Sequence, residues 1–231
     1  MTPNTPTMKT AYTHPRFRSF DYLGTVTSRD TLVRILDAEM PPGRGGRLLD
    51  VGCGSALWKP FLMGRIDEYV GLDVKAGPDV SIVASAEAMP IPDHSFDWIF
   101  SVSAVEHIPD AQSAMAEMHR VLKPGGVAVI GIPFIWGIHG EPHDYRRWTP
   151  HGLKKLAAAF SACEVHQAGN VVTNYLLVQN YYLRLIQEAW PAARFCITPF
   201  IMLNNAIGRL FWTGRPTFTR MATFYWMVAR K

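Results

Sequence analysis

Short apolar runs alternate with helix-like segments between residues 47 and 133, and this alternation is the strongest constraint on the fold. Runs of strand length lie at 47–51, 69–74, 80–84, 96–102 and 127–133, and the segment DAQSAMAEMHRVL (110–122) has helical spacing. Near-continuous apolar strands that alternate with helices are typical of a parallel sheet covered on both faces. The predicted class is therefore α/β, with a doubly wound sheet.

The flanking segments extend this pattern. Apolar residues at 28–40 have helical spacing after Ser28, the expected cap, and a second helix is expected at 150–160 with Thr149 as its cap. Further strands are expected at 163–169 and 223–230. We divide the chain into an N-terminal arm (1–27), a core (28–171), an apolar helical insertion (172–218) and the last strand of the core (219–231).

Composition excludes several classes of protein. The 231 residues are 48% hydrophobic, which suits one domain with an elaboration. The net charge of +4 is spread along the chain without a run of five basic residues, so we expect no nucleic-acid partner. Cys53, Cys163 and Cys196 are too few and too scattered for a disulfide framework, and the N-terminus lacks the apolar region of a secretory signal. We therefore expect a cytoplasmic protein.

The stretch LLDVGCGSA (48–56) is a strand followed by a glycine turn. Gly52 and Gly54 let the backbone approach a ligand closely, a helix expected from about Leu57 would point free N–H groups at it, and Asp50 would face a cation. A phosphate-binding loop needs a Lys-Ser/Thr pair, and a dinucleotide site needs glycine where Leu57 stands. S-adenosylmethionine, with its ammonium and sulfonium, suits the turn better. An ordinary strand-to-helix turn is the alternative.

Several later motifs occur in the order expected after such a turn. Asp73 ends the second strand, and AEAMPIPDHSFD (86–97), an EH pair (106–107) and RVLKPGG (120–126) follow. In combination with the glycine turn, residues 48–133 resemble the class I S-adenosylmethionine-dependent methyltransferases, in the branch that includes ubiquinone and menaquinone methyltransferases; residues 134–168 resemble them more weakly. The resemblance implies a seven-stranded Rossmann-like sheet and methyl transfer, at oxygen, to a small-molecule or lipid-linked saccharide acceptor.

The resemblance also implies roles for individual residues. Asp50, Gly52 and Gly54 would hold the methionine end of the cofactor, and Asp73 would accept the ribose hydroxyls. The full cofactor-binding set is Asp50, Gly52, Cys53, Gly54, Asp73, Val74, Ser85, Ala86, Glu87 and Ser103. Two positions depart from the family pattern. Ala56 replaces a glycine, and Ser85 replaces an aspartate, so the adenine amino group meets a weaker acceptor.

The stretch HGEPHDYRRWTP (139–150) follows the fifth predicted strand, at the sheet edge where ligands bind in doubly wound folds. It resembles the P-H-D-Y-x-R-(W/Y/F)-T-P segment of small-molecule methyltransferases, which implies a loop that shapes the acceptor pocket. An acceptor hydroxyl must lose a proton, and neutral histidine suits that task near pH 7. The candidate bases are His143, His107 and His139, and the candidate acceptor contacts are Tyr145, Arg146, Arg147 and Trp148.

Two other interpretations of this loop are open. In a purely structural loop, an arginine would pair with Asp144 and Trp148 would pack. A metal site would use the alternating side chains of His139, Glu141 and His143. The glycine, the proline and the two arginines of the stretch favour a turn and repel a cation, so we predict no metal.

The apolar insertion at 172–218 has three interpretations. It is a helical cap on the core, a surface for a membrane or a lipid-linked acceptor, or a homodimer interface. Arginines beside tyrosines and tryptophans suit an anionic membrane surface, which would make the protein peripheral to the membrane. Two alternative functions also stay open, a non-catalytic cofactor-binding module of the same fold and an NAD-dependent dehydrogenase.

Overall fold

The computed structural model describes residues 12–215 and 220–231. Its strands are β1 (Arg47–Val51), β2 (Glu68–Asp73), β3 (Ile82–Val83), β4 (Phe96–Val102), β5 (Leu122–Pro133), β6 (Ala162–Gln167) and β7 (Phe224–Arg230). Its α-helices are α1 (Tyr22–Glu39), α2 (Lys59–Leu62), α3 (Ala111–Val121), α4 (Pro150–Leu156), α5 (Val171–Ala189) and α6 (Arg194–Phe211). Short 3₁₀ turns lie at Val105–His107 and Pro191–Ala193.

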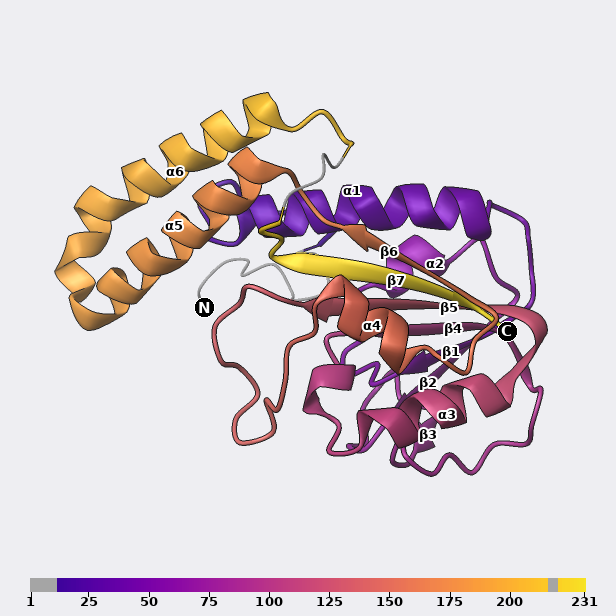
Figure 1. The fold of residues 1–231 in the computed structure, drawn as a ribbon. Coiled ribbons are helices and arrows are strands. Elements are labelled where there is room, and N and C mark those ends of the chain that lie inside the picture. The colour runs from indigo at the N-terminus through magenta and orange to yellow at the C-terminus, as the bar shows by residue number, and fades with distance from the viewer. Residues whose placement is uncertain (1–11, 216–219) are drawn as a thin grey trace.

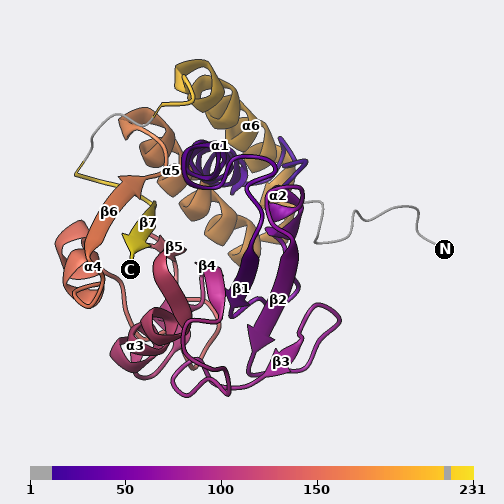
Figure 2. The same cartoon turned by 90° about the vertical axis from the view of Figure 1, so that its right-hand side faces the viewer.

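The described strands form one sheet in the order β3-β2-β1-β4-β5-β7-β6. The strands from β1 to β5 run parallel, whereas β7 is antiparallel to both β5 and β6. Figures 1 and 2 show α1 on one face of this sheet and α3 and α4 on the other. The predicted doubly wound, seven-stranded Rossmann-like sheet is therefore confirmed. Strand order reverses between β1 and β4, which makes their carboxyl ends the expected ligand-binding edge.

Side chains alternate between the two faces of each strand, so neighbouring residues enter different cores. Leu48 of β1 is buried in the cluster that includes Leu32 of α1, and Leu49 in the cluster that includes Met115 of α3. This double burial explains why the central strands read as continuous apolar runs, and it holds the ends of those strands in fixed positions.

The first helix begins earlier than its sequence predicts. Asp21 precedes α1, which starts at Tyr22, and Leu23 is 1% exposed, so residues 22–27 belong to the packed structure and not to the predicted arm. Ser28, the predicted cap, lies inside the helix, where its hydroxyl accepts a hydrogen bond from the Trp226 indole N–H (3.1 Å). The difference arises because this first turn packs against α5 and α6, distant elements that local spacing cannot reveal.

The helix expected from Leu57 is a single turn. α2 covers Lys59–Leu62, with a proline in its first turn, and Gly64 in the left-handed region (φ +81°) follows it. Proline is favoured in a first helical turn and costs a backbone hydrogen bond further inside a helix, which disfavours extension of α2 toward the glycine loop. α2 is therefore too short to direct a large helix dipole at the carboxyl edge of the sheet.

The segment 172–218 contains most of α5 and α6, which lie side by side and extend beyond the carboxyl edge of the sheet (Figure 1). A buried amide network joins them. The Asn180 side-chain amide donates to the Asn205 side-chain oxygen (2.9 Å), and the Asn205 amide donates to the carbonyls of Phe17 (2.7 Å) and Ser19 (2.9 Å). The pair is thus tied to the segment that precedes α1.

Two glycines allow close packing of this helical pair on α1. A Cβ at Gly208 of α6 would lie 2.6 Å from the Leu23 side chain, and one at Gly24 of α1 would lie 2.9 Å from Leu177 of α5. Larger side chains at either position would separate the helices. Among the described helices, none is long and apolar enough to cross a membrane.

Substitution Asn205→Ala should destabilise the protein by about 1–3 kcal/mol, because it leaves buried donors and acceptors without partners. Urea unfolding measures this change in free energy. The matched control is Gln179→Ala on α5, whose amide bonds only to the exposed Tyr175 hydroxyl and should change stability by less than about 0.5 kcal/mol. Equal effects of the two substitutions would show that the amide network does not anchor the helices.

Candidate active site

A cavity of about 440 Å³ opens at the carboxyl ends of β1, β2 and β4. Its lining comes from the loops after these strands, from residues 84–87 after β3, and from the loop between β5 and α4. The predicted site residues that line it are Gly52, Asp73, Val74, Ser85, Ala86, Glu87, Ser103, His107 and His143. The structure therefore gathers cofactor and acceptor candidates around one cavity.

The glycine loop after β1 needs both of its glycines for different reasons. Gly52 has a φ of +72°, and a Cβ there would lie 2.4 Å from the Ala104 Cβ in the loop after β4. Gly54 has a φ of +50°, but a Cβ there would meet no heavy atom within 4 Å. Gly52 thus permits close packing of two loops, whereas Gly54 supplies only a backbone conformation that glycine adopts without strain.

Asp73 fixes the position of this loop from the end of β2. Its Oδ2 accepts a hydrogen bond from the Gly54 N–H (3.0 Å), and its Oδ1 accepts one from the Lys75 N–H (2.9 Å). Its neighbour Val74 is 64% exposed at the rim of the cavity. A partly exposed carboxylate that is held by two backbone donors is well placed to accept hydrogen bonds from a bound hydroxyl-bearing ligand.

The loop after β3 is organised by Ser85 and Glu87. The Glu87 N–H donates to Ser85 Oγ (3.1 Å), and Ser85 Oγ donates back to a Glu87 carboxylate oxygen (3.1 Å). The other Glu87 oxygen accepts from the Asp110 N–H at the start of α3 (2.7 Å). These bonds hold the backbone of Ala86, which is buried at 7% exposure, against the cavity.

The loop after β4 contains a residue in a sparsely populated conformation. Ser103 has a φ of +49°, and its N–H donates to the Gly131 carbonyl of β5 (2.9 Å). Non-glycine residues rarely adopt this conformation, and surrounding structure must enforce it. The result is a sharp turn that brings both Ser103 and His107 into the cavity lining.

Two predicted cofactor residues lie behind the cavity. Asp50 is 3% exposed and accepts a hydrogen bond from the Tyr69 hydroxyl (2.6 Å), and burial raises the pKa of Asp50 to about 7. Cys53 is also buried, and burial raises its pKa to about 12. Both residues, like Gly54 of the glycine turn, are outside the lining, so direct contact with the methionine end of a cofactor stays a prediction for all three.

The loop between β5 and α4 is held by an internal ion pair. Both Asp144 oxygens accept from the Arg147 guanidinium, one at 2.8 Å, and this pair holds the pKa of the Asp144 carboxyl well below its usual range. The backbone N–H of His139 also donates to the Asp144 Oδ2 (3.0 Å). Arg147 is therefore committed to the loop itself. The predicted Thr149 cap accepts from the Gly152 N–H at the start of α4 (3.2 Å).

The remaining candidates for contact with an acceptor differ in their exposure and in their partners within the protein. The His143 Nδ1 is paired with the Tyr145 hydroxyl (2.8 Å), and both side chains are exposed. Arg146 donates to the Pro109 carbonyl (2.7 Å), while Trp148 packs against the core on the α3 side of the sheet. His143 alone of these residues lines the cavity.

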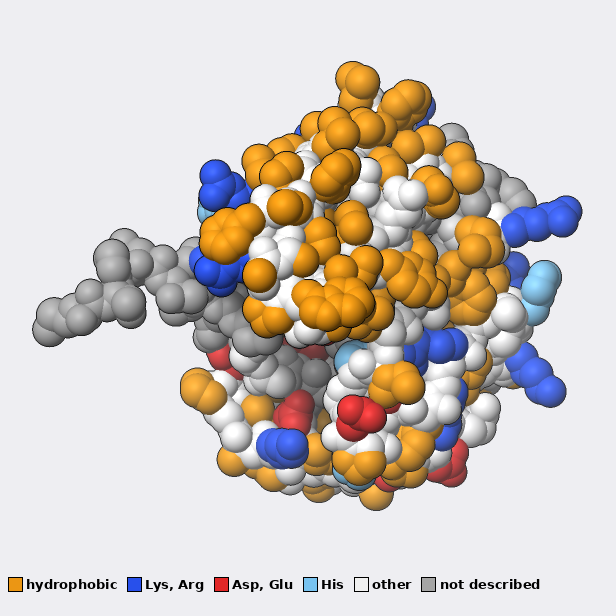
Figure 3. All heavy atoms as spheres, turned by 90° about the vertical axis from the view of Figure 1, so that its left-hand side faces the viewer, with side chains coloured by type: hydrophobic (Ala, Val, Ile, Leu, Met, Phe, Trp, Pro, Cys, Tyr) orange, Lys and Arg blue, Asp and Glu red, His pale blue; other side chains and the backbone are white. Residues whose placement is uncertain are grey.

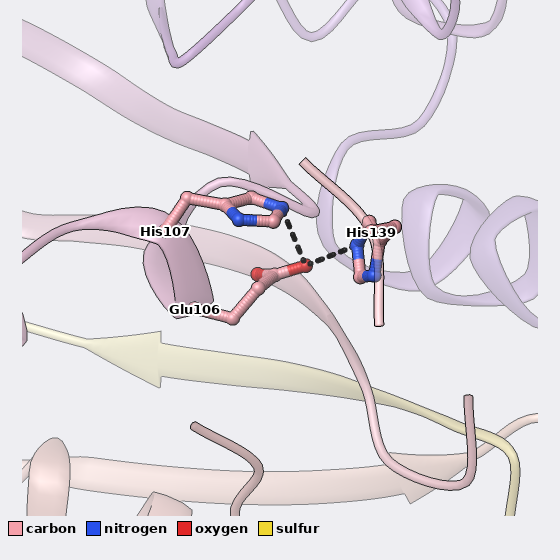
Figure 4. A group of neighbouring side chains, drawn as sticks. All are labelled: Glu106, His107 and His139. Carbon is pink, nitrogen blue, oxygen red and sulfur yellow. Dashed lines mark ion pairs between the residues drawn. The ribbon is translucent and has the colours of Figure 1, made fainter. Parts of the chain in front are cut away.

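A buried carboxylate beside two histidines is a feature that sequence reasoning missed. Glu106 is fully buried, and one of its oxygens lies 3.7 Å from His107 Nε2 and 3.5 Å from His139 Nε2 (Figure 4). This carboxylate raises the pKa of His139. The EH pair after β4 was the available signal, but burial of the glutamate depends on the distant loop that carries His139.

The charges around the cavity favour a cationic ligand. Among the described lining residues, Asp73 and Glu87 carry carboxylates and Lys75 carries the cationic side chain. A dinucleotide pyrophosphate requires basic groups or a helix N-terminus, and the one-turn α2 lies outside the lining. The ammonium and sulfonium of S-adenosylmethionine fit this cavity better than a pyrophosphate does.

Sequence comparison places the chain near methyltransferases. Residues 49–130 match a family model described as a methyltransferase domain. The chain is 38% identical over 136 residues to a demethylmenaquinone methyltransferase of Geobacillus kaustophilus (strain HTA426). The aligned region covers 50% of this chain and 58% of that protein. The chain thus spans a little over half the length of this curated relative.

Structural comparison shows a shared fold. The cyclase SpnF superposes with a TM-score of 0.56 at 18% identity, over 88% of this chain and 80% of that one. The 1,6-didemethyltoxoflavin-N1-methyltransferase of Burkholderia thailandensis, solved with 1,6-didemethyltoxoflavin and S-adenosylhomocysteine, superposes with a TM-score of 0.53 at 17% identity, over 87% of this chain and 76% of that one. At these identities the superpositions establish the fold alone.

Substitution Gly52→Ala should weaken S-adenosylmethionine binding at least tenfold, or by about 1.4 kcal/mol, because the new Cβ pushes the glycine loop away from Ala104. Gly54→Ala introduces a similar backbone strain without that clash and should stay within roughly threefold of the wild-type affinity. Calorimetric titration measures both dissociation constants. Equal affinities of the two variants would contradict the proposed packing of the glycine loop.

Proposed function

We propose that this chain is a class I S-adenosylmethionine-dependent methyltransferase that transfers a methyl group from that cofactor to a small-molecule acceptor attached to an apolar chain. One observation carries the proposal: Gly52 and Asp73 line the same cavity as His143. His143 belongs to the loop between β5 and α4 (residues 134–149), which we call the acceptor loop. The methyltransferase-domain match and the similarity to a demethylmenaquinone methyltransferase support it.

The predicted cofactor residues have distinct tasks in this proposal. S-adenosylmethionine supplies a methyl group that its sulfonium has already activated. Asp73 accepts hydrogen bonds from the ribose, the backbone at Ala86 meets the adenine edge, and Gly52 and Ser103 face the methionine end. Asp50 acts through the glycine loop as a positioning residue, because it is buried near the end of β1, two residues before Gly52.

On the acceptor side, the protein must align an oxygen with the methyl group, exclude water and remove a proton. We assign the proton to His143. If its Nδ1–H donates to the Tyr145 hydroxyl, Nε2 keeps the lone pair that a base needs. His107 is less free, because its Nδ1 bonds to the His143 carbonyl (3.0 Å) and its Nε2 lies near Glu106. Transfer to oxygen releases the hydroxyl proton, and His143 would accept it.

We propose an acceptor with a hydroxyl on a lipid anchor. Arg147 and Trp148 are engaged within the protein, so the loop offers less for an anionic or sugar-like acceptor than its sequence suggests. Apolar side chains instead cover the neighbouring helices, and the Trp136 and Tyr181 rings, 5.6 Å apart, join the acceptor loop to α5. A hydroquinone and a lipid-linked saccharide both present a hydroxyl of this kind.

An assay with two probes tests the proposed function. The full chain is incubated with methyl-labelled S-adenosylmethionine and either a demethylmenaquinol or a polyprenyl-linked saccharide, and label should enter the lipid fraction with one of them. Cofactor binding without transfer to either probe would favour the non-catalytic binding module. Binding of NAD in place of S-adenosylmethionine would favour a dehydrogenase.

Substitution His143→Ala should lower turnover by about 10²- to 10⁴-fold while leaving the S-adenosylmethionine dissociation constant unchanged, because the base is lost and the cofactor contacts are not. His119→Ala on α3, whose ring packs against Phe160, is the matched control and should keep wild-type turnover. Full activity of the His143 variant would remove this residue as the base.

The helical pair α5–α6 carries a large exposed apolar surface. Figure 3 shows hydrophobic side chains gathered over this part of the molecule. Exposed large residues on it include Tyr175, Tyr182, Trp190, Phe195, Phe200, Leu203, Leu210 and Phe211. Surfaces of this kind mark interaction sites, since water-soluble monomers rarely expose so many large apolar groups together.

We propose that an anionic membrane surface covers this helical pair. The charged residues at 171–211 are three arginines and one glutamate, and the Arg194 guanidinium lies over the Phe195 ring (4.9 Å). Basic groups beside exposed aromatic and aliphatic side chains are typical of helices that lie in the membrane interface. Such docking would bring the acceptor loop close to a lipid-anchored substrate.

The protein should float with phosphatidylglycerol vesicles and not with phosphatidylcholine vesicles, because both charge and apolar burial contribute. A Phe195→Ser, Leu210→Ser double variant, changed at positions 74% and 81% exposed, should stay unbound. Val83→Ser on β3, 58% exposed and outside the helical pair, is the control and should float. The proposal would be contradicted if the protein floated with neither vesicle type and formed a dimer through this surface.

A further inference from the structure

We infer that Glu106, His107 and His139 form a binding site for a first-row divalent transition metal beside the acceptor side of the cavity. The three side chains come from the 3₁₀ turn after β4 and from the loop after β5, and they point toward one another (Figure 4). Each offers one ligand atom, and these atoms all lie within 4.8 Å of one another.

The distances suit a shared ion better than direct hydrogen bonds. A Glu106 oxygen lies 3.7 Å from His107 Nε2 and 3.5 Å from His139 Nε2, beyond the normal length of a hydrogen bond. Two ligands that bind one ion at about 2.0–2.2 Å lie roughly 3.3 Å apart at a tetrahedral angle. The two distances from Glu106 are close to this value, and the two imidazole ligand atoms, which lie within 4.8 Å of each other, would move together around the ion.

The opposite edge of each imidazole is already arranged as metal-binding histidines require. His107 Nδ1 lies 3.0 Å from the His143 carbonyl, and His139 Nδ1 lies 3.1 Å from the Gly137 carbonyl. A carbonyl only accepts, so each Nδ1 carries the proton and each neutral ring keeps its lone pair on Nε2. Metal-bound histidines make this second hydrogen bond almost always.

Glu106 supplies an independent observation. Its side chain is completely buried, and neither carboxylate oxygen has a hydrogen-bond partner among the described residues. A buried carboxylate without a partner is costly, and an ion bound between it and the two imidazoles would remove that cost. Arg147 attracts Glu106 electrostatically but makes no hydrogen bond to it, because its guanidinium donates to both oxygens of Asp144.

Two imidazoles and one carboxylate are ligands that suit zinc, iron(II) and manganese(II). His107 also lines the cavity, so coordination positions left open by the protein would face the acceptor. There the ion would polarise the acceptor oxygen and ease loss of its proton. That use rests on the proposed function, whereas metal binding itself is independent of it.

The test is a titration of the full chain, stripped by a chelator, with Zn²⁺ in a calorimeter. The wild type should bind one ion, and Glu106→Gln and His139→Gln should each lower the Zn²⁺ affinity at least tenfold, since even loss of a group that only hydrogen-bonds to a metal ligand costs about 10–100-fold. His166→Gln on β6, a histidine outside the group, should bind as the wild type does. Anomalous scattering at the zinc edge should place the ion between the three side chains.

S-adenosylmethionine titration of each variant separates failure to fold from loss of the metal. Retained cofactor binding with lost Zn²⁺ binding supports the site and is independent of any methyl transfer. If Glu106→Gln does not fold, His107→Gln and His139→Gln decide the question. Absence of one-to-one Zn²⁺ binding by the wild type, or equal binding by the folded ligand variants, would overturn the inference.

Discussion

The close approach of Gly52 to Ala104 is the contact on which the site depends. β1 and β4 are neighbours in the sheet, although about fifty residues separate them in the chain. Their following loops can share one edge only because Gly52 has no side chain, since a Cβ there would lie 2.4 Å from that of Ala104. Asp73 then holds the loop from the β2 side through the Gly54 N–H, and the cavity opens between these elements.

Local sequence patterns predicted the sheet and its ligand-binding edge, because strands buried on both faces must be apolar and ligands bind where such strands end. The resemblance to methyltransferases supplied most of the residues that line the cavity. Features that depend on distant partners were not accessible in this way. Asp50 accepts its hydrogen bond from the Tyr69 hydroxyl, 19 residues away in the chain, and Glu106 meets His139 of a later loop. The early start of α1 likewise follows from its packing on α5 and α6.

The same fold occurs in SpnF, a cyclase by name, so the fold alone does not determine the reaction. What distinguishes this chain lies at one edge of the sheet: a cavity with carboxylates suited to a cationic cofactor, histidines on its acceptor side, and an apolar helical pair beside the acceptor loop. These features together favour methyl transfer to an acceptor that is delivered from a lipid phase.

The most direct test of this account is calorimetric titration of the wild-type chain with S-adenosylmethionine, in parallel with NAD. The account predicts one-to-one binding of S-adenosylmethionine and no heat from NAD, because the cavity provides carboxylates for a cationic ligand and the helix after the glycine turn, α2, has no residue among its described lining. Absence of S-adenosylmethionine binding up to millimolar concentration, or preferential binding of NAD, would contradict it.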